Sequence, residues 1–100
     1  PKEMSDTISA LARLAYRPSD AWLKAFARQA AARLPAFEGH DHGLMLWGLA
    51  TLGAPLSRDW LQTFSREASR KWYTHTGEGL GLMAWGLAQY GFSPYTSQAE

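Results

Sequence analysis

Polar side chains suited to binding phosphate recur at helical spacing in this sequence. Lys24 and Arg28 are four residues apart, and the same spacing relates Gln62, Arg66 and Arg70. Residues four apart lie on one side of an α-helix, so each set forms a stripe. Fixed cations bind phosphate groups, and the release of counterions supplies most of the affinity that does not depend on nucleotide sequence. The alternative interpretation of each stripe is a helix face exposed to solvent.

Positive charge is also sorted along the chain, although the formal net charge is only +1. Residues 19–34 contain three Lys or Arg residues and one acid, and residues 57–73 contain four and two, so each segment carries +2. Residues 36–56 contain two acids and no Lys or Arg, which gives −2. The alternation favours a shared phosphate-binding surface on the two basic segments.

His40, Asp41 and His42 are potential metal ligands because they lie together in the sequence. Residues two apart on a helix point about 200° away from each other, so His40 and His42 do not converge on one ion. A structural zinc site usually has four ligands with cysteine among them, and this chain contains no cysteine. Asp41 is better explained as an acid in the first turn of a helix, where the helix dipole favours negative charge. We therefore expect no metal and no other cofactor.

No recognisable set of nucleophile, base or paired carboxylates suggests catalysis. Residues 77–81 alternate glycine with other residues, but no strand is expected before them and they lack the lysine of a phosphate-binding loop. We expect neither enzymatic activity nor a small-molecule substrate.

The elements that position these residues follow from an internal repeat of 38 residues. A shift by this length aligns Trp22-Leu23 with Trp60-Leu61, and the block starting at Trp47 with the block starting at Trp85. Rare residues in register make chance a poor explanation, and periods of this length indicate stacked helical repeats. The division is residues 1–17 (the last helix of a preceding repeat), 18–54 and 55–92 (two repeats), and 93–100 (the start of a further repeat or a tail).

The first helix of each repeat is expected at about 19–34 and 57–73. Ser19 and Ser57 precede these helices and are suitable N-caps. The apolar residues of each helix recur at helical spacing and define one buried stripe, which includes Trp22 and Trp60. We therefore expect Trp22, Trp47, Trp60 and Trp85 to pack in the core rather than to stack on bases, whereas Trp72 and Tyr73 lie at a helix end beside cations.

The second helix of each repeat is expected at about 40–52 and 78–90, with an earlier copy at about 5–16 that Ser5 and Asp6 open. Gly53 and Gly91 follow the two later helices and suit a left-handed C-terminal cap. The sequence thus predicts an all-α fold, an α-solenoid of stacked helix-turn-helix repeats with about five helices.

Several glycines fall inside these second helices or at their start, where an interior glycine destabilises a helix by about 0.5–1 kcal/mol relative to alanine. We interpret them as points of close approach between helices, and the alternative is that they fray the first turn. The residues concerned are Gly43, Gly48, Gly79, Gly81 and Gly86.

The repeat resembles the octotricopeptide repeat family. Residues 46–53 and 84–91 are similar to the family's leucine-tryptophan-alanine-leucine-alanine block with its terminal leucine and glycine, and residues 18–22 are similar to its proline-containing start. The resemblance covers roughly residues 8–95. Gly39 and Gly77 depart from it, since the family favours proline there.

The resemblance implies RNA binding in a mitochondrion or chloroplast, in RNA stabilisation, processing, translation or ribosome structure. The expected partners are single-stranded RNA or rRNA and other subunits of an organellar complex. The alternative is a structural protein–protein adaptor, because Ile8, Leu11, Leu14 and Tyr16 leave the first helix as apolar as the internal ones. No run approaches the roughly 18 apolar residues of a membrane span, so no membrane partner is expected.

Side chains that read bases in repeat proteins vary between equivalent positions of successive repeats. The equivalent pairs that differ here are Asp20 with Arg58, Lys24 with Gln62, and Ala25 with Thr63. They are candidates for contact with base edges, although random variation of exposed residues would look the same.

Overall fold

The computed structural model describes residues 2–71 and 74–92, and all its regular elements are helical. No strand occurs among these residues, which confirms the all-α class. The elements are α1 (Lys2–Arg13), α2 (Asp20–Arg33), the short 3-10 helix η1 (Leu34–Ala36), α3 (Gly39–Thr51), α4 (Arg58–Arg70) and α5 (Gly77–Gln89).

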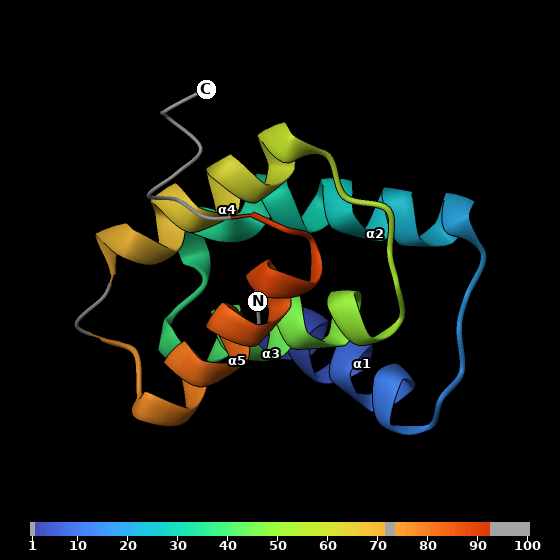
Figure 1. Ribbon diagram of the computed structural model, residues 1–100, viewed down its shortest axis with the longest axis horizontal. Helices are drawn as coiled ribbons and strands as arrows, with labels where there is room; N and C mark the ends of the chain where they lie inside the picture. Colours follow the sequence, from blue (N-terminus) through green and yellow to red (C-terminus); the bar gives the residue numbers. More distant parts are fainter. Residues whose placement is uncertain (1, 72–73, 93–100) are drawn as a thin grey trace.

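The helices form two layers (Figure 1). One layer contains α1, α3 and α5, with α3 in the middle and in extensive contact with both neighbours. The other contains α2 and α4, which touch each other much less. Fully buried side chains from both layers fill the space between them, among them Leu23, Leu34, Met45, Leu49 and Phe64.

The N-caps expected for the first helix of each repeat are confirmed. The hydroxyl oxygen of Ser19 accepts a hydrogen bond from the Trp22 amide at 3.2 Å, and that of Ser57 accepts one from the Trp60 amide at 3.0 Å. The α4 helix ends at Arg70, before the expected position 73, and the interpretation of Trp72 and Tyr73 lies outside the described residues.

The glycine caps of the second helices are confirmed as well. Gly53 and Gly91 adopt φ values of 66° and 63°, in the left-handed region. The following amides turn back to the helix, where Ala54 donates to the Leu49 carbonyl at 2.9 Å and Phe92 donates to the Leu87 carbonyl at 3.0 Å. These bonds satisfy carbonyls that a helix end would otherwise leave unpaired.

The boundaries expected for the first copy of the second helix are wrong at both ends. The α1 helix covers Lys2–Arg13 rather than residues 5–16. Ser5 does not cap it but lies buried inside it, and its hydroxyl donates to the Asp41 carbonyl of α3 at 2.8 Å. A small hydroxyl side chain suits a helix contact as well as a cap, so the residue type alone did not separate the two. The helix ends earlier because Ala15 turns left-handed, with φ 57°.

Close approach at glycine is confirmed where neighbouring helices of this layer meet. A Cβ added to Gly48 would lie 2.9 Å from Ile8 Cγ2, and one added to Gly86 would lie 2.7 Å from Leu46 Cγ. One added to Gly43 would lie 2.8 Å from the carbonyl oxygen of Gly79. The interpretation is wrong for Gly81, which has open space around it.

Among the described residues, no helix combines the length and the apolar character needed to cross a lipid bilayer.

Candidate nucleic-acid interface

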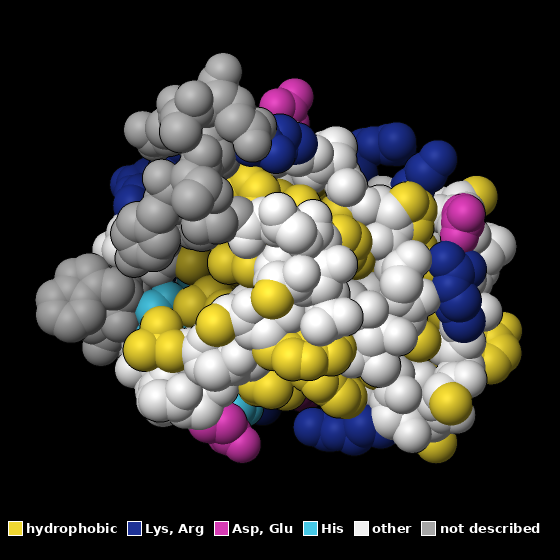
Figure 2. Space-filling view, in the orientation of Figure 1, with side chains coloured by type: hydrophobic (Ala, Val, Ile, Leu, Met, Phe, Trp, Pro, Cys, Tyr) yellow, Lys and Arg dark blue, Asp and Glu magenta, His cyan; other side chains and the backbone are white. Residues whose placement is uncertain are grey.

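Positive charge is concentrated on the layer formed by α2 and α4. The α2 helix contains three Lys or Arg residues against one acid, and α4 contains three against two. In the other layer, the α3 and α5 helices contain one acid each and no Lys or Arg, and the two Lys or Arg residues of α1 are balanced by two acids. Figure 2 shows Lys and Arg side chains along the edge of the molecule where α2 and α4 lie in Figure 1, with other side chains between them. The alternation of charge along the sequence therefore places net positive charge on the α2–α4 layer and net negative charge on the layer of α1, α3 and α5.

A groove of about 630 Å³ lies between α2 and α4. It exists because these two helices are held farther apart than the closely packed helices of the other layer. The side chains along it include both apolar and polar groups. Those from α2 are Lys24, Ala27, Arg28 and Ala31, those from α4 are Asp59, Trp60 and Thr63, and the preceding loop adds Pro55, Leu56 and Ser57.

Trp60 connects the two sides of this groove. Its indole N–H donates a hydrogen bond to the Ala27 carbonyl at 2.7 Å, and its ring stacks on Phe64 with centroids 5.4 Å apart. These contacts fix the ring, which is partly buried and leaves an aromatic edge on the groove. The small side chains of Ala27 and Ala31 leave the space in front of it open.

Lys24 and Arg28 are the two cations of the groove, and both are exposed. Within the described part of the chain, neither forms an ion pair. Asp59 and Thr63 on α4 add a carboxylate and a hydroxyl to the same groove. The arrangement offers cations for phosphate, an apolar surface for a flat ring, and polar groups that hydrogen-bond the edge of a base.

The other predicted members of the basic stripe do not line this groove. Gln62 and Arg66 occupy the positions on α4 that Lys24 and Arg28 occupy on α2, one repeat later. Arg70 lies 3.4 Å from the Glu67 carboxylate, with which it forms an ion pair. The expected row of cations therefore consists of equivalent positions on neighbouring helices, and only the α2 pair meets in the groove.

Some of the candidates for base-edge contact line this groove and others do not. Asp20 forms an ion pair with Arg17 at 2.7 Å, and the guanidinium of Arg58 lies 5.8 Å from the centroid of the Phe92 ring. Neither lines the groove, whereas Lys24 and Thr63 do. Sequence reasoning missed Asp59 as a groove residue, and it also assigned Trp60 to the core alone. The signal for Asp59 was its position just after the Ser57 cap, where the first turn of α4 borders α2.

The core placement expected for tryptophan is wrong at both ends of the chain. Trp47 and Trp60 are partly buried, but Trp22 and Trp85 are exposed. Trp60 packs against α2, the helix one repeat before it, and among the described residues no such helix covers Trp22. The spacing of apolar residues predicts which face of a helix is hydrophobic, but the presence of a neighbouring helix decides whether that face is buried.

The histidines of the candidate metal motif lie in different surroundings. His40 is exposed and lines a groove with Arg13 and Glu78. His42 is fully buried between the rings of Phe37 and Phe64, with its centroid 5.2 Å from that of His75. Burial, together with the nearby His75, lowers the pKa of His42 to about 4. Within the described residues, no three His, Cys, Asp or Glu side chains gather as a metal site would require.

Comparison with models of known protein families, with curated proteins and with solved structures gives no match for this chain. The octotricopeptide resemblance therefore stays a hypothesis carried by the residues quoted above.

Proposed function

We propose that this chain is a segment of an α-solenoid that binds single-stranded RNA in the groove between α2 and α4. The observation that carries the proposal is the pair of exposed cations, Lys24 and Arg28, beside the open aromatic edge of Trp60. Phosphate contacts supply affinity and aromatic surface accepts any base, so this combination suits a single strand without strong sequence preference.

The solenoid is supported by contacts that repeat with the sequence. Ile8 packs on Gly48, and the residues 38 positions later, Leu46 and Gly86, pack on each other in the same way. A contact that recurs after one period is the property that defines stacked repeats.

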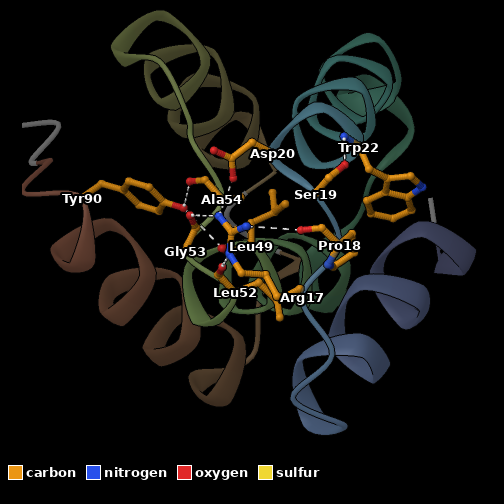
Figure 3. A network of polar contacts seen from close by, with 10 residues as sticks. All are labelled: Arg17, Pro18, Ser19, Asp20, Trp22, Leu49, Leu52, Gly53, Ala54 and Tyr90. Carbon is orange, nitrogen blue, oxygen red and sulfur yellow. Dashed lines mark hydrogen bonds and ion pairs between the residues drawn. The ribbon is translucent and has the colours of Figure 1, made fainter.

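Polar contacts between successive units support the same arrangement. Arg17 donates to the Leu52 carbonyl at 2.7 Å, and the Tyr90 hydroxyl donates to the Ala54 carbonyl at 2.6 Å (Figure 3). Arg17 precedes α2 and Tyr90 follows α5, so both bind the connection between α3 and α4 from opposite sides. These bonds tie each unit to the next across 35 or 36 residues, close to the period.

In the proposed complex, Lys24 and Arg28 neutralise phosphates while a base lies against Ala27, Ala31 and the edge of Trp60. Asp59 and Thr63 hydrogen-bond the edge of that base. A single groove contacts only a few nucleotides, so high affinity requires further units or further subunits. On the family resemblance alone, we propose an organellar protein or ribonucleoprotein (mitochondrion or chloroplast) that acts in RNA stabilisation, processing, translation or ribosome structure.

The test compares two double charge reversals with the same change in net charge. In Lys24→Glu/Arg28→Glu, we expect affinity for a fluorescent single-stranded RNA to fall at least about tenfold, because two phosphate contacts become repulsive. In Arg66→Glu/Arg70→Glu, which changes cations outside the groove, we expect a much smaller loss. Fluorescence anisotropy measures the affinity, and circular dichroism checks that helical content is unchanged.

Equal losses in the two variants would show that RNA binds a diffuse field of cations rather than the groove. Wild-type affinity in Lys24→Glu/Arg28→Glu would contradict RNA binding in the groove itself.

A further inference from the structure

The N-terminal end of the molecule exposes apolar residues whose equivalents one repeat later are buried. Leu14 is 76% exposed, whereas Leu52 is 6% exposed. Tyr16 is 62% exposed, and Ala54 at the equivalent position is 1% exposed. Since the local sequence is similar, the difference comes from the neighbours that cover the internal unit and not the first.

The opposite end shows the same contrast. Leu80 on α5 is 49% exposed, while the equivalent position on α3, His42, is fully buried. Trp85 is exposed as well, whereas Trp47 is partly buried. The α3 helix is covered on this side by α5, and among the described residues no helix covers α5 in that way.

The two ends are complementary in side-chain volume. At both internal contacts, a large residue of one helix, Ile8 or Leu46, lies against a glycine of the next. One repeat beyond these contacts, the position of the large residue is Ala84 and the position of the glycine is Ala10, and both are exposed. Compared with glycine, Ala10 carries an additional methyl group. This group would clash with a side chain as large as Ile8 or Leu46, but it has room opposite the smaller Ala84. The ends therefore suit each other in the register of the internal repeats.

The second layer presents a matching donor and acceptor. Between the two repeats of the chain, Trp60 on α4 donates its indole N–H to the Ala27 carbonyl on α2. Trp22, the equivalent of Trp60, is exposed beside a hollow of about 450 Å³ that Leu11 and Tyr16 also line. At the other end, the equivalent of Ala27 is Ser65 on α4. A second α4 placed on the hollow would bring the Ser65 carbonyl to Trp22.

We propose that copies of this chain associate head to tail, with the α1–α2 end of one copy on the α4–α5 end of the next. The contact continues the internal interfaces between α1 and α3 and between α3 and α5. It is heterologous, because each copy contributes a different face, so association extends into longer chains. The inference is independent of the proposed RNA binding, since it uses none of the groove cations.

The test places a charged, bulky side chain at each end separately. Ala10→Arg blocks the first face and Ala84→Arg blocks the second. Analytical ultracentrifugation of the wild type is expected to show a mass that rises with concentration beyond a dimer, and each variant alone is expected to stay monomeric. The matched control is Ala32→Arg on an exposed position of α2 away from both faces, which should associate like the wild type.

Mixing the two variants distinguishes this contact from every symmetric one. An equal mixture retains one intact face on each partner, so it is expected to form dimers of twice the monomer mass and nothing larger. Such a dimer also shows that both variants are folded. A wild type that is monomeric at all concentrations would overturn the proposal. Association lost in only one variant, or a mixture that stays monomeric, would overturn it equally.

Discussion

At the scale of single residues, His42 is the least expected member of the core. Among the described residues, neither of its two buried ring nitrogens has a hydrogen-bond partner, and the rings of Phe37 and Phe64 flank it. The titratable groups that act on its charge are His75 and Lys71, which lie outside its own helix, and Asp41, which precedes it on α3. An unpaired buried polar group lowers stability, and here it lowers stability further when it is protonated.

The first prediction concerns the pH dependence that His42 causes. Its pKa is about 4 in the folded chain against an ordinary 6.5, so the unfolded chain binds the proton more readily. As pH falls from 6.5 toward 4, the unfolded chain takes up a proton at this residue while the folded chain does not, so the free energy of unfolding decreases. The decrease over this range totals about 3 kcal/mol, and above pH 6.5 none of it is lost. Urea unfolding across this pH range measures it.

The matched variant is His42→Leu, because leucine occupies the equivalent position at Leu80. We expect it to flatten the pH dependence between 6.5 and 4 and to raise stability at neutral pH. Parallel pH profiles in the variant and the wild type would show that other groups cause the loss.

The second prediction concerns Ala15, which adopts φ 57° where the later repeats have Gly53 and Gly91. A side chain in the left-handed region is unfavourable by roughly 1–2 kcal/mol, and glycine recovers part of this because it also makes the unfolded chain more flexible. Ala15→Gly is expected to raise the free energy of unfolding by about 0.5–1 kcal/mol. Chemical denaturation measures the change, and Ala32→Gly in the regular, exposed part of α2 should lower stability by a similar amount.

At the scale of helices, glycine sets the spacing in one layer and tryptophan sets it in the other. Gly43, Gly48 and Gly86 bring α1, α3 and α5 together with backbone or branched side chains in direct contact. Between α2 and α4, the indole of Trp60 spans the gap and holds the helices apart. Close packing on one side and wide spacing on the other leave the groove on the α2–α4 side.

The third prediction separates packing from helix propensity at one repeat position. Gly43 and Gly81 occupy equivalent positions of the repeat. A Cβ added to Gly43 would lie 2.8 Å from the carbonyl oxygen of Gly79, whereas one added to Gly81 would meet open space. Gly81→Ala is expected to stabilise by about 0.5–1 kcal/mol, because alanine is the better helix former and meets open space. Gly43→Ala is expected to destabilise, since the Gly79 backbone cannot move aside as a side chain would. Thermal and urea unfolding measure both, and changes of the same sign would contradict the assignment of close packing.

At the scale of the whole molecule, charge and apolar surface are separated. Net positive charge lies on the α2–α4 layer, and large exposed apolar side chains lie toward the two ends, at Leu14, Tyr16 and Trp22 and at Leu80 and Trp85. The first surface suits a polyanion and the second suits another helical unit. The two proposed interactions therefore use different surfaces and different physical forces.

The fourth prediction is that salt separates these interactions. Contact with two phosphates of a single strand predicts that the logarithm of affinity falls with the logarithm of salt concentration at a slope of about −1.4. Head-to-tail association through apolar faces should change little or strengthen. Anisotropy and sedimentation across a salt series measure the two. RNA affinity that does not change with salt would contradict binding through Lys24 and Arg28.

The sequence by itself determined the features that depend on local chemistry and on the repeat. The serine caps, the glycine caps and the five α-helices of the described residues followed from residue types at defined spacing, because capping and helix formation act over a few residues. The separation of charge by helix type was also visible, since it needs only the assignment of residues to helices.

Only the tertiary structure decided which of these residues meet. It assigned Lys24 and Arg28 to the groove and left Arg66 and Arg70 outside it, because a groove belongs to the gap between two helices. It buried Ser5 against α3, left Gly81 open and exposed Trp22, three outcomes that residue type did not predict. Each depends on which neighbour covers a position, and in a repeat the same residue pattern is buried or exposed according to the units beside it.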